Sequence, residues 1–501
     1  MRRQANPVID VTGGLSTAYD PARIEDKYSP SLQVVRWHKG RLHKAFGSLS
    51  FANQLGEVPM HMYTYRQIDG DRYFVCTTVD KAYYYNVSTN QWTFITSSDV
   101  FTGDEDDLFC MTTCEDTLIV TNGKDAIQKW DGSSWAALGG LSSPSIQAKF
   151  VVPFYNCLFL LNTIEIGTST PFRVRWSDVG DMEEYDESTT LAGYFDIMDT
   201  QDHVVAGIVL GDSLYVLKEN SIWEIYYTGG TDMFKYRSVI QGVGTQSPHS
   251  LHSFGETCGF YGTDNVYEFD GSTAEPIGDH IYNLLYQTED RITNQGKLNR
   301  VRGSYDYHNR LYRLAVPTTT DRPDTEFIYD REVGSWSRRS RQVQCYGFNE
   351  ATSPTLWSAA TGTWTGGSWD SSWLKRGLPE DTPTLVFGSY DQYTYEEDRV
   401  ELSTELLVWE TKDFIFGQSF RLPGVDLHSK GTTIDVSYST DGGFSWSAET
   451  TLNIPSEVYY DDAKYPLNIT CEQIRFRLRT RETAFSLAWI SPWYISRKRS
   501  L

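Results

Sequence analysis

Residues 211–226 read GDSLYVLKENSIWEIY, and the pattern of this stretch recurs along much of the chain. An apolar strand leads into a short turn of Gly, Asn or Asp. An aromatic strand follows and ends at an acidic or polar residue, often with a Trp just after it. Apolar and aromatic runs on both sides of such a turn predict a β-hairpin. A hairpin unit that returns along the chain predicts a repeat architecture.

Other copies of the unit lie on both sides of this stretch. They are at residues 77–96 (TTVDKAYYYNVSTNQWTFIT), 115–135 (EDTLIVTNGKDAIQKWDGSSW), 156–178, 256–271 (ETCGFYGTDNVYEFDG), 309–336 and, more weakly, 384–398. The first five aromatic strands end at Asn86, Asp131, Asp178, Glu224 and Asp270, in steps of about 45 residues, the length of one four-stranded propeller blade. The spacing predicts a six- or seven-bladed β-propeller over residues 51–400. A stacked β-sandwich would give similar hairpins without such even steps.

The two flanking segments differ from the repeats. Residues 1–50 contain no such unit and are rich in Pro and Gly, so we expect an extended arm that lies on another surface. Residues 401–501 alternate apolar and polar side chains in LLVWE, TTIDVSYS, IRFRLRTRE and FSLAWIS, which predicts a small antiparallel β-sandwich. The whole chain is therefore predicted to be all-β, with an arm, a propeller and a sandwich.

Composition limits the classes of function. The net charge is −22, with net positive segments at both termini and a strongly acidic stretch between them. Such a surface repels phosphates, which argues against tight DNA binding, although acidity also serves solubility alone. The sequence contains no run of eighteen apolar residues, so no membrane-spanning helix is predicted. The first residues, MRRQANPVIDVTGG, lack the apolar core of a secretory signal. Seven cysteines without CxxC pairs indicate free thiols in a reducing compartment, and Cys110 and Cys114 are expected to be strand neighbours.

Residues 439–446, STDGGFSW, have the spacing of the Asp-box that is best known from sialidase propellers. Asp441 can accept hydrogen bonds from turn amides, Gly443 permits positive φ, and Trp446 can fold back over the hairpin. Ser439 begins the motif. A sialidase should carry several boxes in its blades, an Arg-Ile-Pro near its N-terminus and three converging arginines. Here one box lies outside the repeats, and Arg23-Ile24-Glu25 lacks the proline. We therefore interpret the box as a structural turn.

Four arginines alternate along the predicted strand near the C-terminus: Arg475, Arg477, Arg479 and Arg481. Alternation places their guanidinium groups on one strand face, where they run parallel and do not converge on one ligand. Two interpretations stay open. The face is either a solvated outer surface or a subunit interface that docks an acidic neighbour.

Other constellations give weaker signals. The acidic run from Gly103 to Asp107 lacks the ligand spacing of an EF-hand and is interpreted as an exposed loop. The histidines of His249-x-x-His252 have no third ligand nearby, so no metal is expected. Trp364, Trp369 and Trp373 are expected to pack across turns, with a sugar-stacking platform as the alternative. No GxxxxGK[ST], GxSxG or HExxH motif is present, so we expect no catalytic residues and no cofactor.

The order of these elements resembles the tail-tube nozzle or packaged-DNA stabilisation proteins of short-tailed double-stranded-DNA phages. The resemblance covers most of the chain, although each of its motifs is short. Its parts are Gly13-Gly14-Leu15, Asp20-Pro21, VVRWHKGRLHKAFGS at 34–48, RVRWSDVGD at 173–181, FRLPGVDLHSKGTTIDVSYSTDGGFSWS at 420–447 and FRLRTRE at 476–482.

The resemblance implies a structural protein of the virion that is assembled in the host cytoplasm. A homo-hexameric ring would sit below an adaptor or tail-tube protein, near a tail fibre, needle or plug protein, and DNA would pass through its lumen without sequence-specific binding. Two other classes stay open. A propeller glycosidase predicts clustered carboxylates in the central pocket, and a carbohydrate-binding adhesin of a tail fibre predicts exposed aromatic residues on one propeller face.

Overall fold

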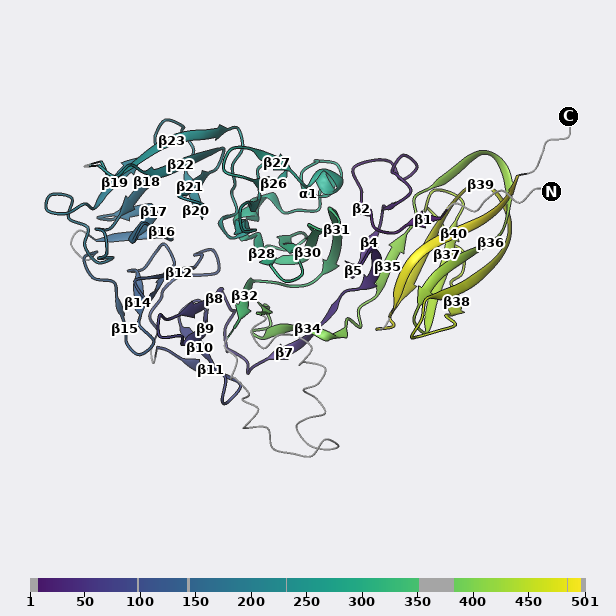
Figure 1. Cartoon of the computed structure of the whole chain (residues 1–501), viewed down its shortest axis with the longest axis horizontal. Helices are drawn as coiled ribbons and strands as arrows, with labels where there is room; N and C mark the ends of the chain where they lie inside the picture. The colour runs from purple at the N-terminus through teal and green to yellow at the C-terminus, as the bar shows by residue number, and fades with distance from the viewer. Residues whose placement is uncertain are drawn as a thin grey trace.

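The computed structural model describes residues 8–96, 99–141, 145–230, 232–350, 383–483 and 485–496. Strands account for 53% of the structure and helices for 4%, so the predicted all-β class is confirmed. The molecule is elongated, with a propeller at one end and the C-terminal strands at the other (Figure 1). Across the described ranges, no helix is both long and apolar enough to cross a membrane.

Six four-stranded antiparallel sheets are the blades of a β-propeller. Five of them consist of consecutive strands. These are β8 (His61–Arg66), β9 (Arg72–Thr77), β10 (Ala82–Asn86) and β11 (Gln91–Phe94); β12 (Cys110–Cys114), β13 (Thr117–Thr121), β14 (Gln128–Trp130) and β15 (Trp135–Ala137); β16 (Ile146–Phe154), β17 (Cys157–Glu165), β18 (Thr168–Trp176) and β19 (Gly193–Asp196); β20 (Val204–Leu210), β21 (Ser213–Lys218), β22 (Ser221–Tyr227) and β23 (Phe234–Gln241); and β24 (His252–Ser253), β25 (Cys258–Tyr261), β26 (Val266–Phe269) and β27 (Ala274–Pro276).

The sixth blade closes the ring with strands from both ends of the propeller sequence. It contains β32 (Cys345–Asn349), β33 (Thr384–Gly388), β34 (Thr394–Leu402) and β7 (Phe46–Phe51). In this blade β7 pairs with β34, so that Ser50 lies opposite Tyr395. Residues 46–50 therefore belong to the propeller and not to the predicted arm. Sequence analysis missed this strand because β7 has no hairpin partner beside it in the chain.

A further four-stranded meander fills the remaining place in the ring. It consists of β28 (Arg302–Asp306), β29 (Leu311–Pro317), β30 (Pro323–Asp330) and β31 (Ser335–Ser340). The inner strands β8, β12, β16, β20, β24, β28 and β32 contact one another in that order, and β32 returns to β8. Six blades are separate four-stranded sheets, and the meander belongs to the larger sheet that continues into the C-terminal strands. This arrangement confirms the predicted six- or seven-bladed propeller. Six of the seven predicted hairpins form the second and third strands of their units, whereas residues 77–96 form β10 and β11, the third and fourth strands of the first blade.

Strands from the N-terminal segment link the meander to the C-terminal strands. β4 (Leu32–Gln33) pairs in parallel with β31 and antiparallel with β35 (Leu407–Glu410). The other short strands of this segment are β1 (Ile9–Asp10), β2 (Gly14–Leu15), β3 (Tyr28–Ser29), β5 (Val35–His38) and β6 (Arg41–Lys44). Of these, β1 and β6 pair with the last strand of the chain. The linked strands form one hydrogen-bonded sheet that runs from the propeller into the C-terminal part.

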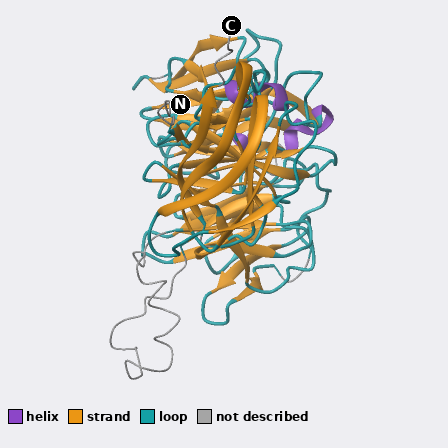
Figure 2. Ribbon diagram, turned by 90° about the vertical axis from the view of Figure 1, so that its right-hand side faces the viewer, coloured by secondary structure: helices purple, strands orange, loops and turns teal. Residues whose placement is uncertain are grey.

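The C-terminal part is built on long antiparallel strands, which face the viewer in Figure 2. Its strands after β35 are β36 (Phe414–Lys430), β37 (Thr433–Ser439), β38 (Thr450–Asn453), β39 (Asp461–Thr480) and β40 (Ser486–Ser496). β39 pairs with β35, β36 and β37, and β36 also pairs with β40. The few helical turns in the described chain are η1 (Pro248–Ser250), η2 (Asp279–Ile281), α1 (Tyr282–Leu285) and η3 (Gln295–Arg300).

One hydrophobic core runs through the link. It includes Trp336 of β31 and Trp409 of β35, each 1% exposed, together with Leu32 of β4 and Phe476 of β39. Burial of such large side chains stabilises the folded state by removing apolar area from water. Because the residues of this core come from the propeller, the N-terminal segment and the C-terminal strands, these three parts stabilise one another.

Candidate functional site: the propeller channel and the loop that crosses it

The inner strands surround a cavity of about 740 Å³ on the propeller axis. Each inner strand or the turn beside it contributes residues to its wall. Glycines let the strands approach closely. A Cβ at Gly303 would lie 2.8 Å from the carbonyl oxygen of Ser250, and one at Gly347 would lie 2.5 Å from Cβ of Met62. Real side chains do not tolerate such distances, so these positions need glycine to keep the ring narrow.

The cavity wall holds a single carboxylate among its described residues, that of Glu350. Arg66 neutralises it through two hydrogen bonds, from Nη2 to Oε1 at 2.5 Å and from Nε to Oε2 at 2.7 Å. Glycoside hydrolysis ordinarily needs two carboxylates that flank the scissile bond. The described part of the wall does not supply that pair.

Three histidines and one arginine form the polar centre of the cavity: His61, His249, His252 and Arg302. The rings of His61 and His249 lie 5.0 Å apart between centroids. Burial and the nearby charge of Arg302 lower the pKa of His61 to about 3, and burial lowers that of His252 to about 4. Burial and Arg302 also hold the pKa of His249 well below its usual range. At neutral pH the three imidazoles are therefore uncharged, and Arg302 is the cation among these four residues.

A second cavity of about 270 Å³ lies on the other side of η1. Pro248 and His249 line both cavities, so the η1 turn lies between them. Asp106 and Asp107 also line the second cavity. They belong to the acidic run that was predicted as an exposed loop. The η1 turn and the acidic loop therefore both lie at the wall of the second cavity.

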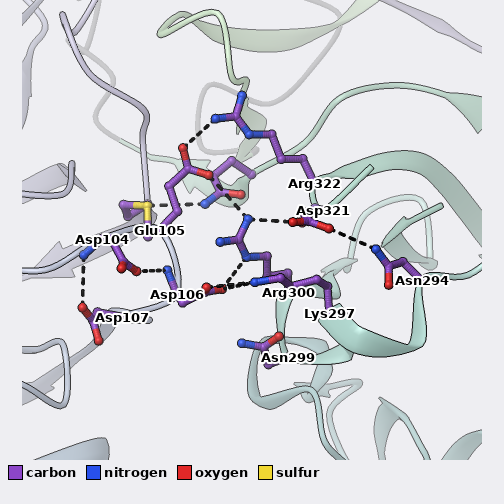
Figure 3. Close-up of polar contacts among 12 residues, drawn as sticks. Asp104, Glu105, Asp106, Asp107, Asn294, Lys297, Asn299, Arg300, Asp321 and Arg322 are labelled. Carbon is purple, nitrogen blue, oxygen red and sulfur yellow. Dashed lines mark hydrogen bonds and ion pairs between the residues drawn. The ribbon is translucent and has the colours of Figure 1, made fainter. Parts of the chain in front are cut away.

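The acidic loop reaches across to cations on a distant part of the ring (Figure 3). Asp106 accepts hydrogen bonds from Nε of Arg300 at 2.7 Å and from Nζ of Lys297 at 2.9 Å. Glu105 accepts one from Nη2 of Arg322 at 2.8 Å. The loop follows the first blade, whereas Lys297 and Arg300 lie in η3 just before the meander. Hydrogen bonds from Arg300 and Lys297 lower the pKa of Asp106, which keeps this carboxylate ionised. The loop is therefore fastened by ion pairs, which its sequence did not indicate.

We expect Asp106→Asn to loosen this loop. The amide loses the negative charge that Arg300 and Lys297 contact. The Arg300 side chain is only 8% exposed, but Lys297 is 26% exposed and Asp106 itself 45%, so water and salt reach the pair. Amide hydrogen exchange of residues 103–108 should quicken by about tenfold, and added salt should quicken it in the wild type, because ions screen exposed pairs. Asp186→Asn is the matched control, since that carboxylate accepts hydrogen bonds only from Ser188 and Thr189 among the described residues. Equal exchange in Asp106→Asn and wild type would contradict the fastening role.

Within the described residues, no group of three or more His, Cys, Asp or Glu side chains is arranged to hold a metal ion. All seven cysteines are free, and Cys110 and Cys114 are neighbours in β12, as predicted. Trp364, Trp369 and Trp373 lie outside the described residues.

The Asp-box folds as the predicted turn at the end of β37. Asp441 accepts hydrogen bonds from Oγ of Ser439 at 2.7 Å and from the amide of Ser445 at 2.9 Å. Nε1 of Trp446 donates to the carbonyl of Gly443 at 3.1 Å, and Gly443 has a φ of 92°. Hydrogen bonds from Ser445 and Ser439 lower the pKa of Asp441 to about 2. The hydrogen bonds of Ser439, Asp441 and Trp446 named here are all made within the box, which explains why its sequence sufficed to predict the turn.

The arginine face and the Asp-box meet in the structure. The guanidinium of Arg477 lies 3.6 Å from the centroid of the Trp446 ring. A Cβ at Gly443 would lie 2.8 Å from Nη1 of Arg475, so this glycine admits the guanidinium beside the turn. The interaction of Arg477 with Trp446 is a cation–π contact.

Most of the arginine face is paired within the chain. Arg475, 8% exposed, forms two hydrogen bonds to Asp413 at 2.8 and 2.7 Å. Arg477 contacts Glu410 at 2.7 Å, and Arg479 contacts Glu449 at 2.8 Å. Arg481 is exposed, and no ion pair is found for it in the described chain. Of the four arginines proposed for a subunit interface, Arg481 is therefore the one without a carboxylate partner in the described chain.

Sequence analysis missed a buried ion network where the meander meets the closing blade. Arg313 of β29 donates from Nη2 to both oxygens of Glu397 in β34, at 2.7 and 3.0 Å. Glu326 of β30 lies 3.4 Å from Nη1 of Arg313 and accepts a hydrogen bond from Tyr346 at 2.7 Å. All of these side chains are buried. The one signal in the sequence is an arginine inside the apolar run LYRLAV.

No family model matches this chain. No curated protein matches it either. Among solved structures, the computationally designed Ika8 protein has a TM-score of 0.35 and 8% identity, over 74% of this chain and 96% of that one. PorZ, an essential bacterial surface component of the type-IX secretion system of Porphyromonas gingivalis, has a TM-score of 0.36 and 9% identity, over 81% of this chain and 46% of its own.

Proposed function

We propose that this chain is a structural protein of a short phage tail, the nozzle ring at the distal end of the tail tube. The observation that carries the proposal is the continuous link between the propeller and the C-terminal strands. Backbone pairing runs from β31 through β4 to β35 and β39, and one apolar core lies along it. Because backbone pairing and one apolar core join the propeller to the C-terminal strands, no flexible hinge separates them. Such rigidity suits a component that bears the pressure of packaged DNA.

The sequence resemblance supplies the remaining features of the proposal. Six copies form a ring beneath an adaptor or tail-tube protein, with a fibre, needle or plug protein nearby. The C-terminal strands act as a sandwich module, and the N-terminal segment lies across neighbouring surfaces as an arm. Arg481 at the end of β39 faces an adjacent subunit. DNA passes through the lumen between the six copies. The acidic surface repels phosphate, so the DNA slides without adhering.

The cavity chemistry supports a structural role over glycoside hydrolysis. A glycosidase needs a proton donor beside a nucleophile or base. The carboxylate described in the cavity wall is ion-paired to Arg66, and His61 and His252 in the same wall are neutral imidazoles. We propose that the chain is not an enzyme and works without a cofactor.

Electron microscopy of the particle that contains this chain tests the function. We expect a ring of six copies at the tail tip, with each propeller and its C-terminal strands placed as one rigid body. A fluorogenic glycoside assay on the purified chain serves as the parallel measurement, and we expect no turnover. Density for this chain away from the tail, or turnover that is lost in Glu350→Gln, would contradict the proposal.

A further inference from the structure

A cavity of about 500 Å³ lies between the β24–β27 blade and the β28–β31 meander, and we call it the interblade cavity. The blade contributes Glu268 of β26 to its wall, and the meander contributes Tyr305, Tyr307, Arg310, Tyr329 and Arg331. Tyr307 is 61% exposed, and the side chains of Arg331 and Glu268 are 26% and 21% exposed. A small molecule in the interblade cavity can therefore reach these groups from solvent.

The wall of the interblade cavity offers both donors and acceptors of hydrogen bonds. Arg331 donates to Oε1 of Glu268, which also accepts a hydrogen bond from the Thr257 hydroxyl at 2.6 Å. The other oxygen, Oε2, has no hydrogen-bond partner among the described residues, and neither has the hydroxyl of Tyr329. Burial raises the pKa of Tyr329, so this hydroxyl keeps its proton at neutral pH. Because a sugar hydroxyl both donates and accepts, it suits this wall better than an inorganic anion, which Oε2 would repel.

One aromatic ring of the wall is held in place and still open to solvent. The hydroxyl of Tyr307 donates to the carbonyl of Ser253 at 2.9 Å, and its ring lies edge-to-face with that of Tyr305, 4.8 Å away between centroids. A ligand that packs on a ring already held in this way costs little side-chain entropy. The exposed face of Tyr307 is therefore suited to the C–H groups on one side of a sugar ring.

The wall also carries a cation without a partner. Arg310 is exposed in the turn between β28 and β29, and its guanidinium has no ion pair or hydrogen bond within the described chain. Arg331 and Glu268 neutralise each other, and Glu268 is the one carboxylate in the described part of the wall. The wall therefore has a net positive charge, which favours a ligand with an acidic group.

We propose that the interblade cavity binds an acidic saccharide, a hexuronic acid whose carboxylate pairs with Arg310 and whose ring packs on Tyr307. The hydroxyl groups of the sugar bind Glu268, Tyr329 and Arg331. A guanidinium matches the geometry of a carboxylate through two parallel hydrogen bonds. A cavity of about 500 Å³ has room for at least one saccharide unit. This inference goes beyond the nozzle function and does not depend on it, because the cavity lies within a single subunit.

Saturation-transfer difference NMR of the full chain tests the site, with sodium glucuronate and sodium galacturonate as the probes. We expect at least one of these uronates to bind. Glucose lacks the carboxylate and sodium acetate lacks the ring, so each should bind about tenfold more weakly than the uronate.

Two variants locate the site, and each removes an exposed side chain, so both should fold. Arg310→Gln should weaken uronate binding about tenfold and leave glucose binding unchanged. Tyr307→Ala should weaken the binding of both sugars about fivefold, because it removes the ring on which they pack. Tyr155→Ala is the matched control, since this tyrosine is 44% exposed in the corresponding turn of another blade, between β16 and β17. It should bind the uronate as the wild type does.

The proposal is overturned if neither uronate gives a signal above that of acetate, or if glucose binds as tightly as the uronate. It is also overturned if Arg310→Gln or Tyr307→Ala, shown to be folded by its thermal transition, binds the uronate as tightly as the wild type. A loss of binding in Tyr155→Ala equal to that in Tyr307→Ala would likewise contradict the assignment to this cavity.

Discussion

Arg313→Met should lower the free energy of unfolding by about 3–5 kcal/mol, the range observed when one partner of a buried ion pair is removed. The substitution leaves Glu397 without its two hydrogen bonds from Arg313, in a site where both side chains are 2% exposed. It also removes the contact of Arg313 with Glu326, which is fully buried. Urea denaturation followed by tryptophan fluorescence measures the loss.

Two comparisons separate this effect from a general loss of arginine. Arg237→Met removes a guanidinium that is 67% exposed and paired with Glu224, and it should leave the urea midpoint within error. The double variant Arg313→Met with Glu397→Gln should recover part of the stability, because the buried carboxylate is no longer charged. If Arg313→Met is as stable as the wild type, the ion network contributes nothing to the free energy of unfolding.

The same ion network should make the stability of the fold depend on pH. Burial acts to raise the pKa of Glu326, but the charges of Arg341 and Arg313 outweigh it and lower the pKa from 4.5 to about 2. A carboxyl group whose pKa is lower in the folded state stabilises the fold above its unfolded pKa, and this stability is lost as the pH falls from about 4.5 towards 2. Because Arg313→Met removes one of these cations, the folded pKa of Glu326 should rise towards 4.5, and the variant should lose less of its stability than the wild type does as the pH falls from about 4.5 towards 2.

A chain that begins at Ala52 should not fold to a stable propeller. The truncation removes β7, which is the outer strand of the closing blade, and β4, which joins the meander to β35. It also exposes apolar area on both sides of the link, where Leu32 and Val35 are each 1% exposed. We expect an insoluble product, or one that lacks a cooperative thermal transition in circular dichroism.

The matched control is a chain that begins at Val8, which keeps every described strand. It should melt as the full chain does. Supplying residues 1–51 as a separate peptide should restore a cooperative transition in the truncated chain, because the missing strands can pair without covalent connection. A truncated chain that melts like the wild type would show that ring closure by β7 is dispensable.

Local chemistry decided which parts of the fold were predictable. The hairpin units could be predicted because both strands and the turn lie within about twenty to thirty residues of one another. Six of the seven units form the second and third strands of a blade or of the meander, and residues 77–96 form the third and fourth strands of theirs. The Asp-box was recognised because Asp441 binds residues two and four positions away. The predicted propeller begins at residue 51, whereas β7 begins at Phe46. No sign of this strand appears in the sequence, because β7 pairs with a strand more than three hundred residues further along the chain.

The candidate site was predicted only in fragments. His249 and His252 were visible as a pair, but a single sequence does not show that His61 and Arg302 share their cavity. The acidic run was visible, but its cations at Lys297, Arg300 and Arg322 lie about two hundred residues away. The arginine face was visible, but its acidic partners Glu410 and Asp413 lie more than sixty residues away in the chain. For the acidic run and the arginine face, the sequence showed the charged side chains but not the residues with which they form ion pairs.

The sequence by itself determined the all-β class, the repeated hairpin and the Asp-box turn, because alternation, turn residues and short-range hydrogen bonds act between near neighbours. Tertiary structure alone decided which strand closes the ring, which cation meets which carboxylate, and which side chains share the interblade cavity. These outcomes depend on distances between residues far apart in the chain. Coulomb and packing energies follow those distances in space and are independent of separation along the sequence.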